Sequence, residues 1–295
     1  MNTTRQRPIY HASFWLVSLT LALLWYLFML PQSPPVSGQL CQNQEILFIG
    51  SSRPLASNDE PLRLYLLALG QRVTVRTDKE VKTEDAQGKA LIIISETSES
   101  AAINTKFRTV AVPILTWEGW LQDDLAMTAV GAPASTTKTT GPTTEVSPQD
   151  KDEGAYGERV GQRAIRIINE NHPLAASYHG EVTTVFSRQS KFHWGVPAPS
   201  AIRVAVDIAN EQHSMLYAYE SGAAMVGYTA PARRVFLHNA AAPYLTHEGL
   251  TLFLTAAYWA MNCLDEPTAP TPTATSTALS TFTTTPTPIP TEQVT

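Results

Sequence analysis

The sequence predicts an α/β domain with a flavodoxin-like, doubly wound and mainly parallel sheet, followed by a β-rich second half. Strand-like and helix-like segments alternate between residues 45 and 115, as in a chain of βαβ units. One strand segment, residues 90–95, is wholly apolar, as expected for a central strand of a parallel sheet. Beyond residue 160, strand-like segments follow one another through tight connections, which favours added strands at one edge.

The first half is predicted to contain four parallel strands, at residues 45–49, 72–76, 90–95 and 110–115. A helix begins near Asn58, where a capping residue is followed by early acids and Pro61, and it ends at Gly70. A second, short helix covers residues 98–107. The first helix is expected to bury the apolar side chains of Leu62, Leu64, Tyr65, Leu66 and Leu69.

The second half contains further strand candidates and one closing helix. The strand candidates are residues 163–168, 181–186, 202–208, 215–219, 224–228 and 234–237. The helix is predicted over residues 246–263, with Thr246 as its cap. Its inward face is expected to consist of Leu250, Phe253, Leu254, Ala257 and Met261.

Residues 14–30 predict a transmembrane anchor, because they contain no charged residue and reach the lower length limit for a membrane-spanning helix. Arg5 and Arg7 precede this segment, and no Lys or Arg follows before Arg53. The positive-inside rule therefore predicts a single-pass protein of the cell membrane, with a cytoplasmic N-terminus and an extracytoplasmic domain. A cleaved signal peptide is the alternative; a lipoprotein and a buried core helix fit this segment less well.

Changes in composition along the chain predict the domain organisation. Residues 1–13 form the cytoplasmic N-terminus, 31–43 a linker and 44–264 the α/β domain, which carries a polar insertion at 131–158 that is predicted to be disordered. Residues 265–295 form a tail dominated by Thr and Pro, which cannot bury enough apolar surface to offset the entropy of ordering. Glycosylation of this tail is left open.

Charge and cysteine content narrow the possible partners and compartments. The net charge of −5 gives no basic footprint, so nucleic acid is not expected as a partner. The only cysteines, Cys41 and Cys263, bracket the predicted domain. Outside a membrane, two thiols within reach oxidise, which predicts a disulfide that joins the ends of the domain. Two unpaired thiols are the alternative.

Several stretches together resemble a known group of domains. They are the GSS that follows the first strand, the phrase VAVPILTWEGWLQDDLAMT, NENHPL, YESGAAMVGYTAPARRVFL and the closing AYWA. Over residues 44–262 the chain resembles extracellular bacterial domains of the class I glutamine amidotransferase-like superfamily, near the trehalose-utilisation (ThuA-like) branch. The resemblance implies a flavodoxin-like fold but no particular reaction, because fold alone does not settle function.

The resemblance also indicates that a catalytic cysteine is missing. Amidotransferases of this superfamily place a cysteine at the tight turn after a central strand, whereas this chain has Ser95-Glu96-Thr97-Ser98 there. Ser95 or Ser98 could serve as a hydrolase nucleophile, with a base among His172, His193 and His247. The alternative is that these serines cap a helix. No catalytic residue is therefore assigned, and no cofactor is expected.

The best ligand-binding candidates follow the fourth strand, in Trp117-Glu118-Gly119-Trp120 and at Asp124. Ligands bind at the carboxyl ends of strands in open α/β sheets, aromatic faces stack on sugar rings, and carboxylates accept hydrogen bonds from hydroxyls. In the alternative reading, both tryptophans pack in the core and the acids cap a helix. Glu118 is the strongest polar candidate because it stands directly past a strand.

Two further candidates lie in family-like stretches. His172, which precedes Pro173, could bind a ligand or simply stabilise a turn. Glu220 could contact a ligand or pair with an arginine of the stretch Pro231-Ala232-Arg233-Arg234. No motif with HExxH or CxxC spacing is present, so no metal site is predicted.

The leading hypothesis is a membrane-anchored module that binds a small molecule, such as a carbohydrate, without catalysis. The alternatives are a ThuA-like hydrolase or sugar-modifying enzyme that uses carboxylates and His172, and a scaffold in an envelope complex whose protein partners the sequence does not identify.

Overall fold

The computed structural model describes residues 41–131, 151–152, 154–180 and 182–264. The predicted anchor at 14–30, most of the insertion and the tail lie outside these residues, so the expectations about them stay predictions. Within the described part, no helix combines the length and apolar character needed to cross a bilayer.

Five parallel strands form one half of the sheet, one more than the four that the sequence predicted. Their bounds are β1 (Glu45–Gly50), β2 (Arg72–Thr77), β3 (Leu91–Ile94), β4 (Ile114–Thr116) and β12 (Arg234–Leu237). They lie in the order β2-β1-β3-β4-β12, and each neighbouring pair is parallel. Because β12 takes the fifth place, this is the 2-1-3-4-5 order of flavodoxin-like folds.

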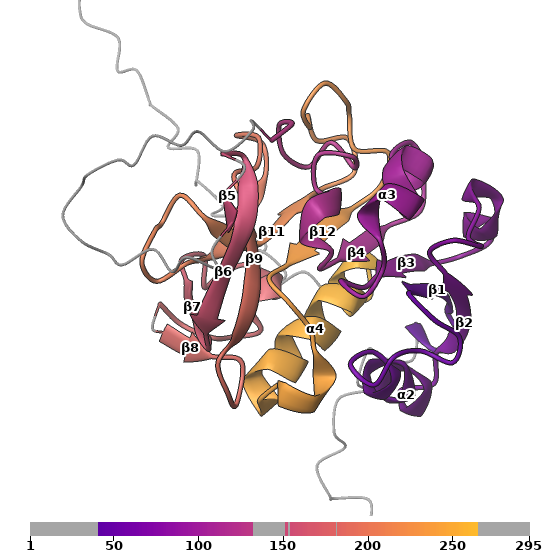
Figure 1. The fold of residues 1–295 in the computed structure, drawn as a ribbon, viewed down its shortest axis with the longest axis horizontal. Coiled ribbons are helices and arrows are strands. Elements are labelled where there is room, and N and C mark those ends of the chain that lie inside the picture. Colours follow the sequence, from indigo (N-terminus) through magenta and orange to yellow (C-terminus); the bar gives the residue numbers. More distant parts are fainter. Residues whose placement is uncertain (1–40, 132–150, 153, 181, 265–295) are drawn as a thin grey trace, which may run out of the picture. The chain divides into compact units, whose positions relative to one another are not determined.

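The other half of the sheet is antiparallel, so the sheet is mixed rather than mainly parallel. From β12 it continues through β11 (Ser214–Tyr219), β10 (Ile202–Val206), β7 (Ala164–Ile167) and β8 (Val182–Thr184). Beside this path, β9 (Ser190–Gly195) pairs with β11 and with β6 (Tyr156–Gln162), and β6 pairs with β5 (Lys151–Asp152). Figure 1 shows these strands on the side of the domain away from β1 and β2.

Helices cover both faces of the parallel strands. The helices α2 (Glu60–Ala68) and α4 (His247–Ala260) pack on the face that carries Ile46 and Phe48. The short α3 (Ser100–Ile103) and the 3₁₀ turn η3 (Asn104–Phe107) pack on the opposite face, which carries Leu47 and Ile49. Successive strand side chains thus enter two separate cores, which is why β3 is apolar throughout and β1 is apolar after its first residue, Glu45. The remaining 3₁₀ turns are η2 (Thr83–Ala86), η4 (Gly119–Leu121), η5 (Pro173–Ala175) and η6 (Ala242–Tyr244).

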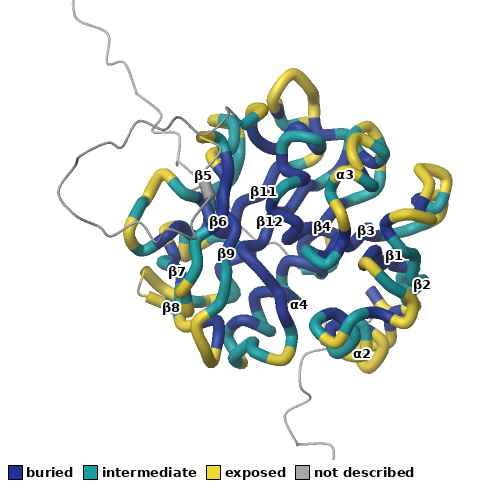
Figure 2. Tube along the Cα trace, in the orientation of Figure 1, coloured by how far each residue is buried: buried dark blue, intermediate teal, exposed yellow. Residues whose placement is uncertain are grey.

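The expected inward face of α2 is wrong in most of its members. Only Leu62 and Leu66 are buried, four residues apart on one side of the helix. Leu64, Tyr65 and Leu69 are 50%, 45% and 42% exposed, and Figure 2 shows exposed residues along this helix. Two buried leucines, one helical turn apart, are enough to pack this short helix against the edge of the sheet. Its other apolar side chains therefore stay in solvent.

Three other predicted segments differ from the structure. The fourth strand starts only at Ile114, because Pro113 precedes it and lacks the N–H that a ladder needs. Residues 224–228 form a turn, closed by the Met225 N–H that donates to Tyr228 O, and not a strand. The insertion was predicted to extend to residue 158, but β6 begins at Tyr156 and pairs with β9 from its first residue.

The closing helix α4 is shorter than predicted but capped as expected. The Thr246 Oγ1 accepts a hydrogen bond from Gly249 N–H. Phe253 and Ala257 are buried as predicted, whereas Leu250, Leu254 and Met261 lie only partly buried at the rim of the core. The buried face also includes five residues that were not predicted to belong to it: Gly249, Leu252, Ala256, Trp259 and Ala260.

A disulfide joins Cys41 to Cys263, with the two Cα atoms 5.6 Å apart. The sequence predicted this pairing and left two free thiols as the alternative. The bridge closes a loop with a sequence separation of 222 residues. It ties the segment before β1 to the segment after α4 and occupies both thiols of the chain.

Candidate functional site

Polar side chains converge where the parallel strands end. Glu96 follows β3, Glu118 follows β4 and Asn239 follows β12, while Lys191 and His193 come from β9. Glu158 of β6 completes the group. These six residues are called the carboxyl-end cluster below, and they lie at the edge where open α/β sheets bind ligands.

Glu96 lies at the centre of the carboxyl-end cluster. Its Oε2 accepts a hydrogen bond from Asn239 Nδ2 at 3.2 Å and lies 3.5 Å from His193 Nε2. The same oxygen is 4.0 Å from Lys191 Nζ, which in turn is 3.5 Å from Glu158 Oε2. The Lys191 side chain is 41% exposed and the Glu96 side chain 14%, so solvent reaches the cluster through these two groups.

Glu118 holds the turn that follows β4. Its Oε1 accepts a hydrogen bond from the Trp120 N–H at 3.1 Å, which caps η4. Burial raises the pKa of Glu118 to about 8, and the nearby Glu96 adds to the rise. At neutral pH this carboxyl is therefore protonated, and its O–H is a hydrogen-bond donor.

His193 is buried with unused hydrogen-bonding capacity. Its side chain is 2% exposed, and neither ring nitrogen has a hydrogen-bond partner among the residues that the structure describes. The ring lies against the backbone of Gly119, where an added Cβ would come within 1.6 Å of His193 Nδ1. Glycine at position 119 is thus what allows the imidazole of β9 to sit beside the turn after β4.

Trp120 lies next to this imidazole. Its ring centroid is 6.3 Å from that of His193 and 5.9 Å from that of Tyr156, both in edge-to-face geometry. The side chain is half-buried, so part of it faces solvent. The cluster therefore has an aromatic border formed by Trp120.

His238, the residue after β12, is buried behind the cluster. Its ring stacks on Phe192 with centroids 4.5 Å apart, and within the described residues neither ring nitrogen is hydrogen-bonded. Burial lowers the pKa of His238 to about 3, and the nearby His193 lowers it further, so the ring is neutral. The backbone N–H of His193 donates to the carbonyl of His238, which holds β9 over the end of β12.

A second polar group closes the ends of β1 and β3 and is fully satisfied. The two oxygens of Asp59 accept hydrogen bonds from Ser95 Oγ and Thr97 Oγ1, each at 2.6 Å. Burial raises the pKa of Asp59 to about 6, although both hydroxyls oppose the rise. Ser98 Oγ donates to Ile49 O. Because Ser95 and Ser98 bond to these acceptors, neither hydroxyl is paired with a histidine base in the described part, and serine catalysis has no geometric support.

Of the residues predicted to bind ligand, Glu118 and Trp120 lie in or beside the cluster, whereas Trp117 does not. Trp117 is fully buried and packs edge-to-face between Phe48 and Phe253. Its side chain belongs to the core, which is the packing role that the sequence left open. Successive side chains of β4 and of Trp117, which follows it, point to alternating faces of the sheet. The side chain of Trp117 therefore lies, like that of Leu115, on the face that α4 covers.

The other three predicted residues lie apart from the cluster in structural roles. Asp124 is half-buried, and its backbone carbonyl accepts from Arg108 Nε. His172 caps η5, where its Nδ1 accepts from Leu174 N–H at 3.2 Å. Glu220 pairs with Arg233, with Oε2 and Nε 2.7 Å apart. For His172 and Glu220, the structure thus shows the turn and ion-pair roles that the sequence offered as alternatives.

Sequence reasoning missed Glu96, Lys191, Glu158 and Asn239 as site residues. The signal for Lys191 was a two-residue period: Lys191 and His193 alternate with Phe192 and Trp194 along β9. A strand was not expected there, and residues 156–158 were assigned to the insertion. For this reason, pairing between β6 and β9 could not be anticipated.

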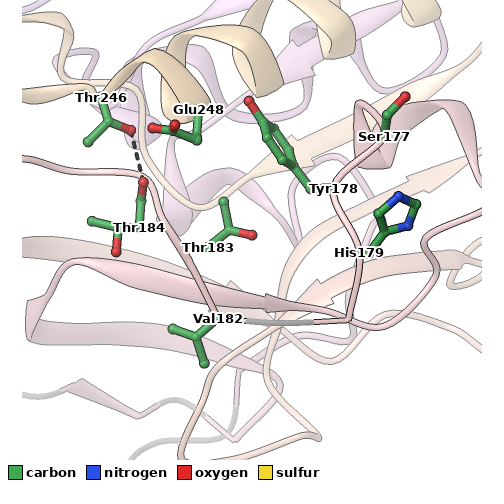
Figure 3. A pocket seen from close by; sticks show the side chains of 8 residues that line it. All are labelled: Ser177, Tyr178, His179, Val182, Thr183, Thr184, Thr246 and Glu248. Carbon is green, nitrogen blue, oxygen red and sulfur yellow. Dashed lines mark hydrogen bonds between the residues drawn. The ribbon is translucent and has the colours of Figure 1, made fainter.

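A separate open pocket of about 650 Å³ lies by the N-terminal end of α4. Figure 3 shows its lining, which is mostly hydroxyl-bearing, with Thr246 bonded to Thr184 O at 2.9 Å. Its titratable lining residues are Tyr178, His179 and Glu248. The His179 side chain is 76% exposed and lies 3.6 Å from Glu170, so it is not aimed into a desolvated site. None of the predicted ligand-binding residues lines this pocket.

No group of three or more metal-ligating side chains in the described residues is arranged to hold a metal ion. His193 and Glu96 are two neighbouring side chains of metal-ligating type, but the other neighbours of Glu96 are the amide of Asn239 and the ammonium group of Lys191. The cluster is therefore suited to hydrogen bonding rather than to cation coordination.

Comparison with known proteins gives only a distant likeness. No family model and no curated protein matches the chain. A solved glutamine amidotransferase from Thermotoga maritima is similar with a TM-score of 0.39 and 9% identity, over 67% of this chain and 76% of that chain. At that distance, the fold and the site of this chain rest on its own topology and contacts.

Proposed function

We propose that this domain is a non-catalytic binding module for a small polyhydroxylated ligand, such as a carbohydrate, at the carboxyl-end cluster. The observation that carries the proposal is His193: a buried imidazole without hydrogen-bond partners among the described residues, 3.5 Å from the Glu96 carboxylate and edge-to-face with the half-buried Trp120. Leaving such a group unpaired is costly, and a ligand that hydrogen-bonds to it would remove the cost.

The chemistry of the cluster favours hydroxyl groups. A hydroxyl both donates and accepts, and a neutral imidazole offers one nitrogen of each kind. Glu118 with its raised pKa adds a donor, and Glu96 adds an acceptor. Trp120 supplies an aromatic surface on which the apolar face of a sugar ring can stack.

Two observations support the absence of catalysis. Both cysteines are joined in the disulfide, so no thiolate can act as the amidotransferase nucleophile. Ser95, which occupies the turn after β3, donates its hydroxyl to Asp59. We further infer that the chain is a divergent relative of class I glutamine amidotransferase-like domains, near the ThuA-like branch; the 2-1-3-4-5 strand order and the quoted motifs support this.

We also infer an extracytoplasmic domain anchored by residues 14–30. The disulfide supports this placement, because structural disulfides persist mainly in oxidising compartments. The apolar segment preceded by Arg5 and Arg7 supports the orientation.

The test is a ligand screen on the full-length oxidised chain in a mild detergent, read out by thermal unfolding. A ligand present at 100 times its dissociation constant stabilises by about 2.7 kcal/mol. We expect a saccharide hit whose stabilisation is lost in Trp120→Ala and Glu96→Gln but kept in His179→Ala, which changes an exposed residue of the other pocket.

Other outcomes would contradict the proposal in different ways. A hit whose affinity survives both cluster substitutions would place the ligand elsewhere. Conversion of the hit into a product would favour the hydrolytic alternative. A screen without hits across mono- and oligosaccharides would favour the scaffold alternative.

A further inference from the structure

The solvent face of α2 is apolar and is not covered by any described residue. Leu64, Tyr65, Leu67 and Leu69 are between 38% and 50% exposed. The charged residues of the helix, Glu60 and Arg63, lie in its first turn and pair with each other. From residue 64 to residue 69 the helix carries no charge.

Such a surface needs a partner that offers apolar contact without charge complementarity. A surface helix normally buries its apolar stripe and turns a polar face to water, whereas α2 is apolar on both sides over its last turns. Contiguous exposed apolar side chains of this kind mark interaction sites for membranes or proteins. A tyrosine among leucines suits the membrane interface, where its ring is buried and its hydroxyl is hydrated.

The chain enters the domain beside the C-terminal end of α2. Gln71 Nε2 donates to Cys41 O at 2.6 Å, and Asn43 N–H donates to Gly70 O at 2.9 Å. Only residues 31–40 separate this point from the apolar segment 14–30. Ten residues span at most about 35 Å when fully extended, so a bilayer that holds residues 14–30 lies within that distance of α2.

We propose that the exposed face of α2, formed by Leu64, Tyr65, Leu67 and Leu69, docks on the lipid surface next to the membrane anchor. The proposal rests on the inferred anchor, and it goes beyond it by fixing which side of the domain faces the bilayer. A tether of this length keeps the helix near lipid at all times, whereas a second copy or another protein would have to reach it by collision. The carboxyl-end cluster is formed by other elements, so ligand binding there can be tested independently.

The experiment places the full-length chain, one copy per disc, in nanodiscs of phosphatidylethanolamine and phosphatidylglycerol that contain a photoactivatable phospholipid. After illumination, lipid adducts are located by mass spectrometry. We expect adducts in residues 14–30 and in residues 64–69, and none at Ile168 or Val182, which are equally exposed apolar residues on other elements. The triple variant Leu64→Ser, Leu67→Ser, Leu69→Ser should lose the second set of adducts and keep the first.

Each alternative result overturns the docking proposal. Adducts confined to residues 14–30 would show an anchored domain that does not rest on α2. Adducts at Ile168 and Val182 as well would show unspecific labelling, and adducts in neither segment would refute the anchor itself. An intact disulfide and an unchanged unfolding midpoint in the triple variant confirm that the substitutions leave the fold in place.

Discussion

Two groups of buried polar side chains in the sheet are satisfied to different degrees. At the ends of β1 and β3, Asp59 accepts two hydroxyl hydrogen bonds at 2.6 Å, so its oxygens are satisfied by the protein. His193, within β9, and His238, directly after β12, are equally buried, but their ring nitrogens have no hydrogen-bond partner among the described residues, although His193 Nε2 lies 3.5 Å from Glu96 Oε2. The hydrogen bonds of Asp59 hold loops together, whereas the ring nitrogens of the two histidines keep capacity for hydrogen bonding.

This difference separates polar groups that the protein satisfies from groups that keep hydrogen-bonding capacity. A network that is complete in itself has nothing to offer a ligand, and Ser95, placed where a nucleophile would stand, belongs to such a network through its hydrogen bond to Asp59. A buried imidazole whose nitrogens make no hydrogen bond carries an energetic cost that a ligand can remove. The predictions below test this division, starting with the disulfide that joins the two ends of the domain.

Removing the disulfide should have the largest effect, because it ties the start of the parallel half to the end of α4. In the chain-entropy model, opening a loop with a separation of 222 residues costs on the order of 5 kcal/mol. We expect the double variant Cys41→Ser, Cys263→Ser to lose about this much unfolding free energy in urea. The control is the wild-type chain after reduction, which should behave like the variant; a loss below about 1 kcal/mol would contradict the entropic argument.

Glu118→Gln should change how stability depends on pH. The pKa of Glu118 rises from 4.5 to about 8 on folding, so the folded state binds a proton that the unfolded state releases. This contribution to stability is present below pH 4.5 and is lost as pH rises through 8. Glutamine removes the titration and can still accept from Trp120 N–H, so the variant should exceed wild type by about 3 kcal/mol at pH 7.

The measurement is urea unfolding at several values between pH 4 and pH 9. Asp59, with its pKa raised to about 6, also makes the protein less stable as pH rises between about 4 and 6. That loss occurs in both proteins and cancels in their difference. Parallel stability curves for Glu118→Gln and wild type would refute the raised pKa.

Gly119→Ala should reveal how closely the two halves meet. An added Cβ would lie 1.6 Å from His193 Nδ1, so the imidazole or the turn has to move, which costs about 2 kcal/mol. His193→Ala removes the obstruction, and in that background Gly119→Ala should cost nearly nothing. A double-mutant cycle from urea unfolding measures this coupling, and additive effects would mean that β9 is not held against the turn.

The first strands of the parallel half were predictable because the composition of each segment indicates whether it is buried. A wholly apolar β3 and an apolar β1 ending in glycine indicate buried parallel strands from the local sequence alone. The side of α2 that is buried was not predictable, because a nine-residue helix that is apolar nearly all round has no periodicity to indicate it. Its burial is decided by where the sheet lies.

The site was only half predictable for a related reason. Glu118 follows β4 directly, so strand topology alone placed it at the carboxyl edge. Lys191 and Glu158 reach the same edge through pairing between β6 and β9, a long-range contact that begins inside a stretch with the composition of a linker. Trp117 failed as a site residue because the pleat of β4 turns it into the core, next to Phe48.

The smallest expected effects concern exposed charges of the parallel half, and adjacent residues provide a matched pair. Lys79 Nζ lies 3.9 Å from Glu99 Oε2, with both side chains more than half exposed. Asp78 is buried and accepts from the backbone N–H groups of Lys79 and Glu99 at 2.8 and 2.7 Å. The turn after β2 thus carries one solvent-exposed ion pair and one buried carboxylate whose hydrogen bonds are made within the protein.

Lys79→Ala should change the unfolding free energy by less than about 0.5 kcal/mol, because solvent screens the pair and mobile side chains lose entropy when they form it. Asp78→Ala should cost about 2 kcal/mol, since it leaves two part-buried backbone N–H donors without their acceptor. Urea unfolding of the two variants and of the wild type measures both changes in unfolding free energy under the same conditions. Equal effects would mean that this part of the fold is not held by its internal hydrogen bonds, and its contrast with His193 and His238, whose ring nitrogens make no hydrogen bond among the described residues, would lose its physical basis.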